Sequence, residues 1–326
     1  MKIAFFGTSD FSKNILNWIL EQWGIEVWLV ISQPDKPVGR KKIITPTPIK
    51  VFAEEKWIKV FQPVKLKTSP QPSPSEEREQ EEIIKFYEEL KKWDFDFIVV
   101  VAYWKIVPVE VLEAPKYWCI NIHGSILPDY RWASPIQEAV KNWDKETWLT
   151  IMYMSKWMDE WDILAIEKVN IDKHDNTLDI FDKFEKIGPK LLINTLNWVL
   201  DWSIKWKKQD DSKATFCTKI SKEDWNIDFK VESWENIYNK FKAYSPWPWI
   251  YSYYNDKKIS FEDIELTQDT APGFEIWKII KNWKKIWVVT SDNKIIILKQ
   301  VKLEWKKSMD ILSFVNWNKD FLEYKF

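Results

Sequence analysis

The segment from Asn121 to Gln137 constrains the fold of this chain most strongly, because it has the pattern of a strand end followed by a loop and a helix. The apolar, β-branched run at 97–102 predicts a buried strand, and a short apolar approach leads into Asn121. Residues two apart in a strand share a face, so Asn121 and His123 are expected to project side by side. Ligands bind at the carboxyl ends of strands in open α/β sheets, and this pair therefore marks the expected site.

The first half of the chain alternates strand and helix patterns. A strand at 1–6, a helix at 14–23 and a strand at 25–32 predict a doubly wound, mostly parallel α/β sheet. Further on, strands are expected at 147–154 and 164–169, before a long helix at 176–200 that Gly188 and Pro189 interrupt.

The last third of the chain has a different pattern, with short β-type runs separated by turns. These runs predict a small C-terminal β-barrel resembling an OB-fold. The 326 residues are therefore expected to form two domains. We assign residues 1–203 to a catalytic domain, 204–218 to a polar linker and 219–326 to the barrel. Within the first domain, the Ser-, Pro- and Glu-rich stretch at 68–82 is interpreted as a flexible low-complexity insertion.

Composition narrows the class of protein. The formal net charge is −1, so any contact with nucleic acid must come from a local basic patch. There are two cysteines and two histidines, without a metal-ligand spacing, so no metal site is expected. The chain lacks a secretory or transmembrane pattern, which predicts a soluble, cytoplasmic protein with no membrane contact.

The tryptophan and glycine contents are abnormal, with 24 Trp and only 6 Gly. An average chain of this length has roughly 23 Gly, at about 7%. Trp57 follows a helical stretch where a glycine cap belongs, and Trp143 lies in an Asn-x-Asp turn. We interpret all Trp except Trp247 as glycines encoded by UGA and written as Trp, because these positions need a residue that tolerates positive φ.

The chain resembles the folate-dependent formyltransferases. The resemblance rests on Asn121-Ile-His123, on Ser125-Ile-Leu-Pro128 and on an acid some forty residues later, in Asp159-Glu-Trp-Asp162. It covers most of the chain in the family's order and implies a monomeric enzyme whose C-terminal domain, residues 219–326, binds tRNA. Such an enzyme would move the formyl group of 10-formyltetrahydrofolate to the α-amine of initiator methionyl-tRNA.

The resemblance also implies roles for particular residues. The catalytic residues would be Asn121, His123 and Asp162, with Asp159 as the second choice for the acid. An amide donor stabilises an oxyanion, an imidazole carries a proton, and a carboxylate orients the imidazole. The folate-binding residues would be Ser125, Ile126, Leu127, Pro128, Ala102 and Tyr103. For Arg131, contact with substrate phosphates and contact with the folate tail both remain open.

A basic loop lies between residues 33 and 45. Its four cations would contact the phosphates of tRNA: Lys36, Arg40, Lys41 and Lys42. Taken alone, a charge run is more often only a solvated surface. Two other functions remain open, since the Asn-His-Asp site alone does not exclude them. One is a formyltransferase acting on a small amine, such as a sugar nucleotide or glycinamide ribonucleotide. The other is an RNA-binding protein without catalysis, if the tryptophans are real.

Overall fold

The computed structural model describes residues 1–39, 41–66, 77–156 and 159–326. The chain divides into two compact units. The first consists of Met1–Pro135, Thr147–Val169 and Phe181–Cys217, and the second of Ile136–Glu146, Asn170–Ile180 and Thr218–Phe326.

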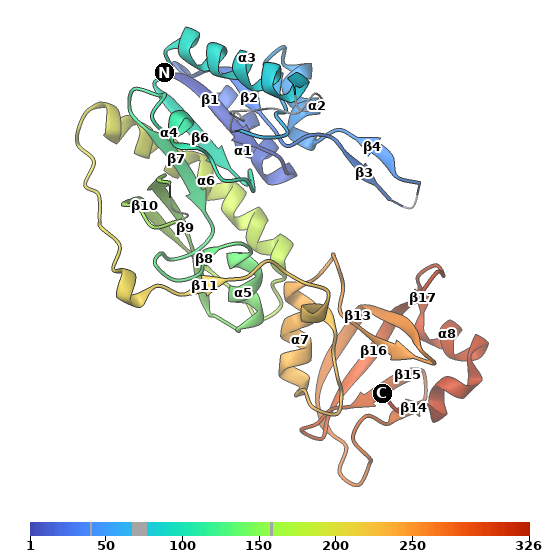
Figure 1. The fold of residues 1–326 in the computed structure, drawn as a ribbon. Coiled ribbons are helices and arrows are strands. Elements are labelled where there is room, and N and C mark those ends of the chain that lie inside the picture. Colours follow the sequence, from blue (N-terminus) through green and yellow to red (C-terminus); the bar gives the residue numbers. More distant parts are fainter. Residues whose placement is uncertain (40, 67–76, 157–158) are drawn as a thin grey trace. The chain divides into compact units, whose positions relative to one another are not determined.

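A seven-stranded sheet forms the centre of the first unit, in the order β10-β9-β7-β6-β1-β2-β5 (Figure 1). Neighbouring strands in the part β7-β6-β1-β2-β5 are parallel, and β9 pairs with β7 in antiparallel fashion. The bounds of the strands are β1 Lys2–Gly7, β2 Glu26–Ile31, β5 Lys59–Phe61, β6 Phe97–Val101, β7 Cys119–His123, β9 Glu146–Tyr153 and β10 Ile163–Asn170. The predicted mostly parallel sheet is confirmed.

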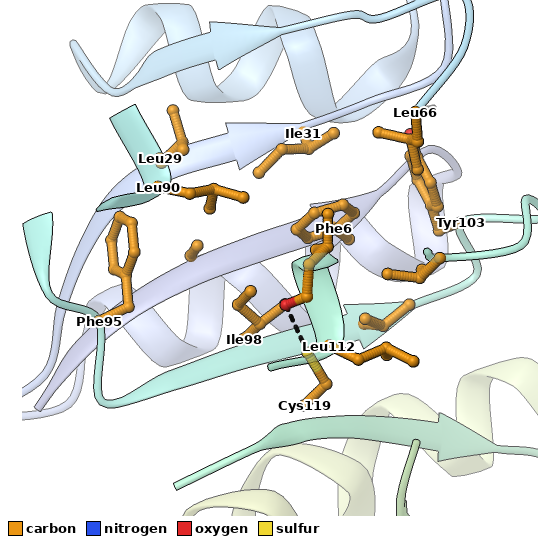
Figure 2. Packing of buried hydrophobic residues seen from close by; sticks show 14 of the residues in the cluster. Phe6, Leu29, Ile31, Leu66, Leu90, Phe95, Ile98, Tyr103, Leu112 and Cys119 are labelled. Carbon is orange, nitrogen blue, oxygen red and sulfur yellow. Dashed lines mark hydrogen bonds between the residues drawn. The ribbon is translucent and has the colours of Figure 1, made fainter. Parts of the chain in front are cut away.

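Helices lie on both faces of this sheet. Their bounds are α1 Asp10–Leu20, α2 Pro48–Glu55, α3 Glu77–Trp93, α4 Val109–Leu112 and α6 Thr177–Leu200. Phe86 and Leu90 of α3 and Val111 of α4 join sheet residues such as Phe6 and Ile98 in one buried cluster (Figure 2). Helices α1 and α6 meet on the opposite face, where the rings of Phe11 and Phe181 lie 5.4 Å apart.

Helix α6 is not interrupted at Gly188 and Pro189, contrary to the expectation from the sequence. A Cβ on Gly188 would lie 2.9 Å from Cδ2 of Leu149, so glycine allows the helix to pack closely against β9. Proline removes one backbone hydrogen bond of a helix. Packing along the whole length of α6 outweighs that loss, and Leu192 and Leu196 beyond the proline are fully buried.

The second unit contains an antiparallel sheet in the order β12-β13-β16-β15-β14, with β17 paired to β16. Its elements are α5 Pro135–Lys141, α7 Trp234–Ala243, β12 Tyr251–Tyr254, β13 Lys257–Thr270, β14 Ile279–Asn282, β15 Lys285–Val289, β16 Lys294–Leu303, β17 Met309–Asp310 and α8 Ile311–Trp317. Strand β13 has several register shifts along β16, and such irregularities bend a strand. The predicted C-terminal β domain is confirmed as an antiparallel one.

The segment predicted as a linker, residues 204–218, belongs to the first unit as far as Cys217 and pairs with it at two places. Strand β11 (Phe216–Cys217) pairs in parallel with β8 (Arg131–Trp132). Lys207 forms a bridge with Ile163, and the short 3-10 helix Asp211–Lys213 lies between these contacts. In the low-complexity stretch, residues 77–82 belong to α3, whereas 68–76 lie outside the described residues.

Positive φ angles are concentrated at tryptophans. Of the nineteen described non-glycine residues with positive φ, ten are Trp: Trp57, Trp104, Trp118, Trp132, Trp143, Trp202, Trp249, Trp277, Trp283 and Trp305. Positive φ is a clear outlier for a bulky L-residue and is ordinary for glycine. The backbone at these ten positions therefore has a conformation that glycine adopts without strain. The other twelve described tryptophans, Trp247 aside, do not have positive φ, so the expectation that these positions need a residue tolerant of positive φ is wrong for them.

Candidate active site

The site is centred on the carboxyl end of β7. Val101, the last residue of β6, pairs with Ile122, and Gly7, the last residue of β1, pairs with Val101. The three strands thus end at the same edge of the sheet. Asn121 is half-buried and His123 is buried, on one face of β7. In the described part of the chain, the Asn121 amide has no side-chain hydrogen bond, so its N–H groups are available to a ligand.

Both ring nitrogens of His123 face oxygen atoms. Nε2 lies 3.0 Å from the carbonyl oxygen of Tyr130, which can only accept a hydrogen bond, so Nε2 carries the hydrogen. Nδ1 lies 3.8 Å from Oδ1 of Asp159, which is beyond hydrogen-bond length but within the range of a charge interaction. His123 is therefore held in one ring orientation, with its basic nitrogen beside a carboxylate.

The two candidate acids have different surroundings. Asp159 faces His123, and its Oδ2 accepts a hydrogen bond of 2.9 Å from the backbone N–H of Trp132. Asp162 immediately precedes β10, and its carbonyl accepts from the N–H of Tyr153. Burial, and secondarily the Asp162 charge, raise the pKa of the Tyr153 hydroxyl. The acid beside the imidazole is thus Asp159, the second choice from the sequence.

In the Ser125–Pro128 loop, the side chains of Ser125 and Leu127 are buried and contact other residues of the protein. The Ser125 hydroxyl donates a hydrogen bond of 2.6 Å to the carbonyl of Asp129, and the side chain is fully buried. Leu127 packs in a small apolar cluster with Met152 and Ile163. Ile126 and Pro128 are half-buried. Ser125 and Leu127 therefore shape this loop from within, and Ile126 and Pro128 have the side chains that remain partly accessible.

Ala102 and Tyr103 follow β6 at the same edge of the sheet. Ala102 has φ 47°, so the chain turns sharply directly after the strand. The Tyr103 ring is buried edge-on against Phe6, and burial raises the pKa of its hydroxyl. Its carbonyl accepts a hydrogen bond of 2.9 Å from the Gln33 side chain. This turn carries backbone groups beside Asn121 and His123.

Arg131 is not a surface residue. Its side chain is 2% exposed, and its guanidinium donates to Oε1 of Gln209 and to Oδ1 of Asp211. Neither contact with substrate phosphates nor contact with a folate tail, the two options left open above, fits a guanidinium that is buried and hydrogen-bonded in this way. Gln209 was missed from the sequence, because it lies in a polar stretch without any periodicity.

The predicted basic loop forms a hairpin of β3 (Lys36–Val38) and β4 (Ile43–Thr45), which extends away from the body of the first unit (Figure 1). Lys36, Lys41 and Lys42 are exposed, and Arg40 lies outside the described residues. Three apolar side chains of the hairpin are also exposed: Val38, Ile43 and Ile44. Their exposure, with the cations, is typical of a surface that binds a partner.

In the part of the chain that the structure describes, no cluster of three or more His, Cys, Asp or Glu residues is placed to hold a metal ion. Likewise, none of the described helices combines the length and apolar character needed to cross a bilayer. The second histidine, His174, is exposed, and its Nδ1 lies 3.1 Å from the Tyr238 hydroxyl in the second unit.

Two family profiles that match this chain, and a sequence relative, belong to the formyl transferases. The profile of the "Formyl transferase" family matches residues 1–196, and that of its C-terminal domain matches residues 219–319. Methionyl-tRNA formyltransferase of Caldicellulosiruptor saccharolyticus is 38% identical over 97% of this chain and 96% of its own length.

Two solved structures share the fold. One is methionyl-tRNA formyltransferase from Clostridium thermocellum, with a TM-score of 0.57 and 16% identity, covering 93% of this chain and 98% of that one. The other is an N-formyltransferase from Helicobacter canadensis in complex with folinic acid and dTDP-3-aminofucose, with a TM-score of 0.62 and 18% identity, covering 91% and 98%.

Proposed function

This chain belongs to the formyl transferase family, and we propose that it transfers the formyl group of 10-formyltetrahydrofolate to the α-amine of initiator methionyl-tRNA. The observation that carries this proposal is the 38% identity to methionyl-tRNA formyltransferase over nearly the full length of both chains. The geometry at the end of β7 supplies the chemistry. An unpaired amide and an oriented imidazole lie on one face of a buried strand.

The amide of Asn121 stabilises the oxyanion. Attack of the amine on the formyl carbon forms a new carbon–nitrogen bond and places negative charge on the formyl oxygen. When the carbonyl re-forms, the bond between the formyl carbon and the folate nitrogen breaks, and tetrahydrofolate leaves with a proton on that nitrogen. The Asn121 side chain is free to donate to that oxygen. Loss of one such donor in other enzymes raises the barrier by about 3–4 kcal/mol. Asn121→Ala should therefore lower kcat about 10²–10³-fold with little change in KM.

His123 takes the proton that the attacking amine loses. Its Nε2–H is held by the Tyr130 carbonyl, so Nδ1 is the nitrogen with a lone pair. Protonation at Nδ1 produces an imidazolium 3.8 Å from Oδ1 of Asp159, and the carboxylate stabilises that charge. We therefore propose Asp159 for the acid. The sequence-based choice of Asp162 stays a prediction, which comparison of the two Asp→Asn variants will test.

Folate is proposed to bind where the turn after β6 and the Ser125–Pro128 loop lie beside this pair. The family uses 10-formyltetrahydrofolate as its one-carbon donor. Backbone groups of Ala102 and Tyr103 would meet the polar pterin edge, and Ile126 and Pro128 would contact its apolar surface. Fluorescence titration with a stable folate such as 5-formyltetrahydrofolate measures this binding. Ile126→Glu should weaken it about tenfold, whereas the exposed Ile84→Glu change should not.

The acceptor amine is proposed to be the α-amine of the methionine that is esterified to tRNA. The exposed lysines of the β3–β4 hairpin would contact phosphates, since such contacts supply affinity and position without reading sequence. A formylation assay with charged initiator tRNA tests the acceptor directly. A gel-shift series over increasing salt tests the phosphate contacts, because counterion release gives a steep salt dependence. Transfer to a small amine with no binding of tRNA would overturn this assignment.

A small-amine acceptor is the second candidate, and the Helicobacter canadensis neighbour is a reason to test it. At 18% identity that neighbour supports the fold only. An aminosugar nucleotide should give a kcat/KM at least about 10³-fold lower than charged tRNA, because its single diphosphate replaces few of the phosphate contacts that tRNA can make. We further propose that the enzyme acts in the cytoplasm as a monomer. Light scattering at assay concentration measures that state, and a dimer mass would contradict it.

We also propose that glycine is the native residue at the ten Trp positions with positive φ. Their backbone conformation supports this, and so does the exposure of indoles such as Trp57 and Trp283, which are 96% and 91% exposed. Mass spectrometry of peptides from the native protein measures the residue directly. Trp at positions 132 and 143 would refute the proposal. It would also strengthen the remaining alternative, an RNA-binding protein without catalysis, because exposed indoles stack on bases.

A further inference from the structure

The buried guanidinium of Arg131 is the starting point, because a buried charge must be paired within the protein. Gln209, itself 6% exposed, accepts hydrogen bonds from Nε and Nη2 of Arg131 at 3.1 and 2.9 Å. Asp211 accepts a further bond from Nη2 at 2.6 Å, and Glu160 lies 4.0 Å from Nη1. The guanidinium has donors only, so the amide oxygen of Gln209 must be the atom that faces it.

Because the amide oxygen of Gln209 faces Arg131, its amide nitrogen points away from Arg131 toward other partners. Its Nε2 donates to the carbonyl of Asp159 at 2.9 Å and to the carbonyl of Trp161 at 2.6 Å. Both donors of the amide are therefore used on the backbone of the loop that carries the acid. Asp159 itself has φ 58°, a conformation that Asp tolerates better than most residues but that still requires support.

The same loop is held from the other side. The backbone N–H of Trp132, next to Arg131, donates to Oδ2 of Asp159 at 2.9 Å, which leaves Oδ1 facing His123. The backbone of Arg131 is fixed by β11, because its N–H donates to the carbonyl of Thr215 at 2.9 Å. All these residues belong to the first unit, so the network is internal to it.

We propose that Arg131 and Gln209 are positioning residues, which fix the Asp159 carboxylate against His123 through the two backbone carbonyls at 159 and 161. Neither side chain is expected to touch substrate, since both are buried and their polar atoms are engaged. The segment between the two domains thereby supplies part of the active-site support. This inference rests on the proposed function, because Asp159 is the catalytic acid only if the site transfers a formyl group.

Gln209→Glu is the sharpest test. Glutamate keeps the size of the side chain and keeps Arg131 paired, so the variant should fold. It replaces two N–H donors by a carboxylate oxygen facing two carbonyls, which should push the loop away. We expect kcat to fall about 10–100-fold with KM for tRNA within about twofold, because a small misplacement of a catalytic group has effects of that size.

Lys208→Gln is the matched control. It changes the net charge by the same amount one residue away, and its side chain is exposed. We expect kcat and the thermal midpoint of this control to equal those of the parent protein. If Gln209→Glu lowers only the thermal midpoint and leaves kcat unchanged, Gln209 is merely structural and the proposal is wrong.

An NMR measurement separates this inference from the proposed function. The chain has two histidines, so a ¹⁵N-labelled imidazole spectrum shows two ring systems. Gln209→Glu should move the ring resonances of His123 and leave those of His174 in place. If the His123 resonances shift but the parent protein has no formyltransferase activity, the positioning network is supported and the proposed function is rejected. Unmoved His123 resonances would reject the network, whatever the activity.

Discussion

The end of β7 and the β3–β4 hairpin are both polar, yet they differ in how their charges are satisfied. At the end of β7, His123, Asp159 and Arg131 are paired inside the protein, whereas the half-buried Asn121 amide has no side-chain hydrogen bond to any residue that the structure describes. On the hairpin, three lysines and three apolar side chains face solvent. The buried region is organised before any ligand arrives, whereas the hairpin gains its contacts only from a partner. Changes in the first should therefore alter kcat, and changes in the second should alter KM.

The largest expected effect is at His123. His123→Ala should lower kcat about 10²–10⁴-fold, because it removes the group that accepts the proton. Binding of tRNA, measured by gel shift, should stay within about twofold of the parent. His174→Gln is the control, since that exposed histidine lies in the other unit, and its kinetics should be normal. Near-normal turnover of His123→Ala would show that the proton leaves by another route.

The choice of acid has the next largest effect. Asp159→Asn keeps the size of the side chain but removes the charge beside His123, so kcat should fall about 10²-fold. Asp162→Asn should change kcat less than about threefold, because Asp159 is the carboxylate 3.8 Å from the ring. Single-turnover rates of both variants measure the chemical step. The opposite ranking would restore Asp162 and overturn the assignment made from the geometry.

The hairpin should behave differently. Changing Lys36, Lys41 and Lys42 together to Ala should raise KM for tRNA and reduce the salt slope of binding by about 2–3, because each lost phosphate contact lowers that slope by about 0.7–0.9. The kcat at saturating tRNA should change little.

The matched control for the hairpin is a triple change of exposed lysines on α3, Lys85, Lys91 and Lys92, to Ala. It removes the same total charge from the same unit, so it separates loss of the hairpin contacts from loss of net charge. We expect the hairpin variant to lose more of the salt slope than the control. An unchanged salt slope in the hairpin variant would exclude this surface from binding.

The smallest expected effect is on stability. Trp57 lies beyond the end of α2 with φ 58°. Trp57→Gly should raise the free energy of unfolding by about 1–2 kcal/mol, since it relieves a left-handed conformation. Trp57→Ala is the control, because alanine keeps the Cβ and so keeps most of the strain. Equal denaturant midpoints for the two variants would mean that this position does not require glycine.

Local patterns were sufficient to predict the elements that form the site. The β-branched run of β6 and the Asn121-x-His123 spacing placed both side chains on one face at a strand end, since strand periodicity is a property of the local chain. The prediction that α6 breaks at Gly188 and Pro189 was wrong. The close packing of Gly188 against Leu149 favours a continuous helix, and a Gly-Pro pair in the sequence does not indicate that packing. The choice between Asp159 and Asp162 was also beyond local patterns, because both lie in the same short stretch.

By itself, the sequence determined the order of strands and helices, the Asn121–His123 pair and the basic loop at 33–45, and it included the ten Trp positions that have positive φ. All of these depend on residues close together in the chain. Only the tertiary structure decided which carboxylate meets the imidazole and why Arg131 is buried. Those contacts join residues from 123 to 211, and their distances depend on how β7, the loop at 159–161 and the segment after α6 pack together.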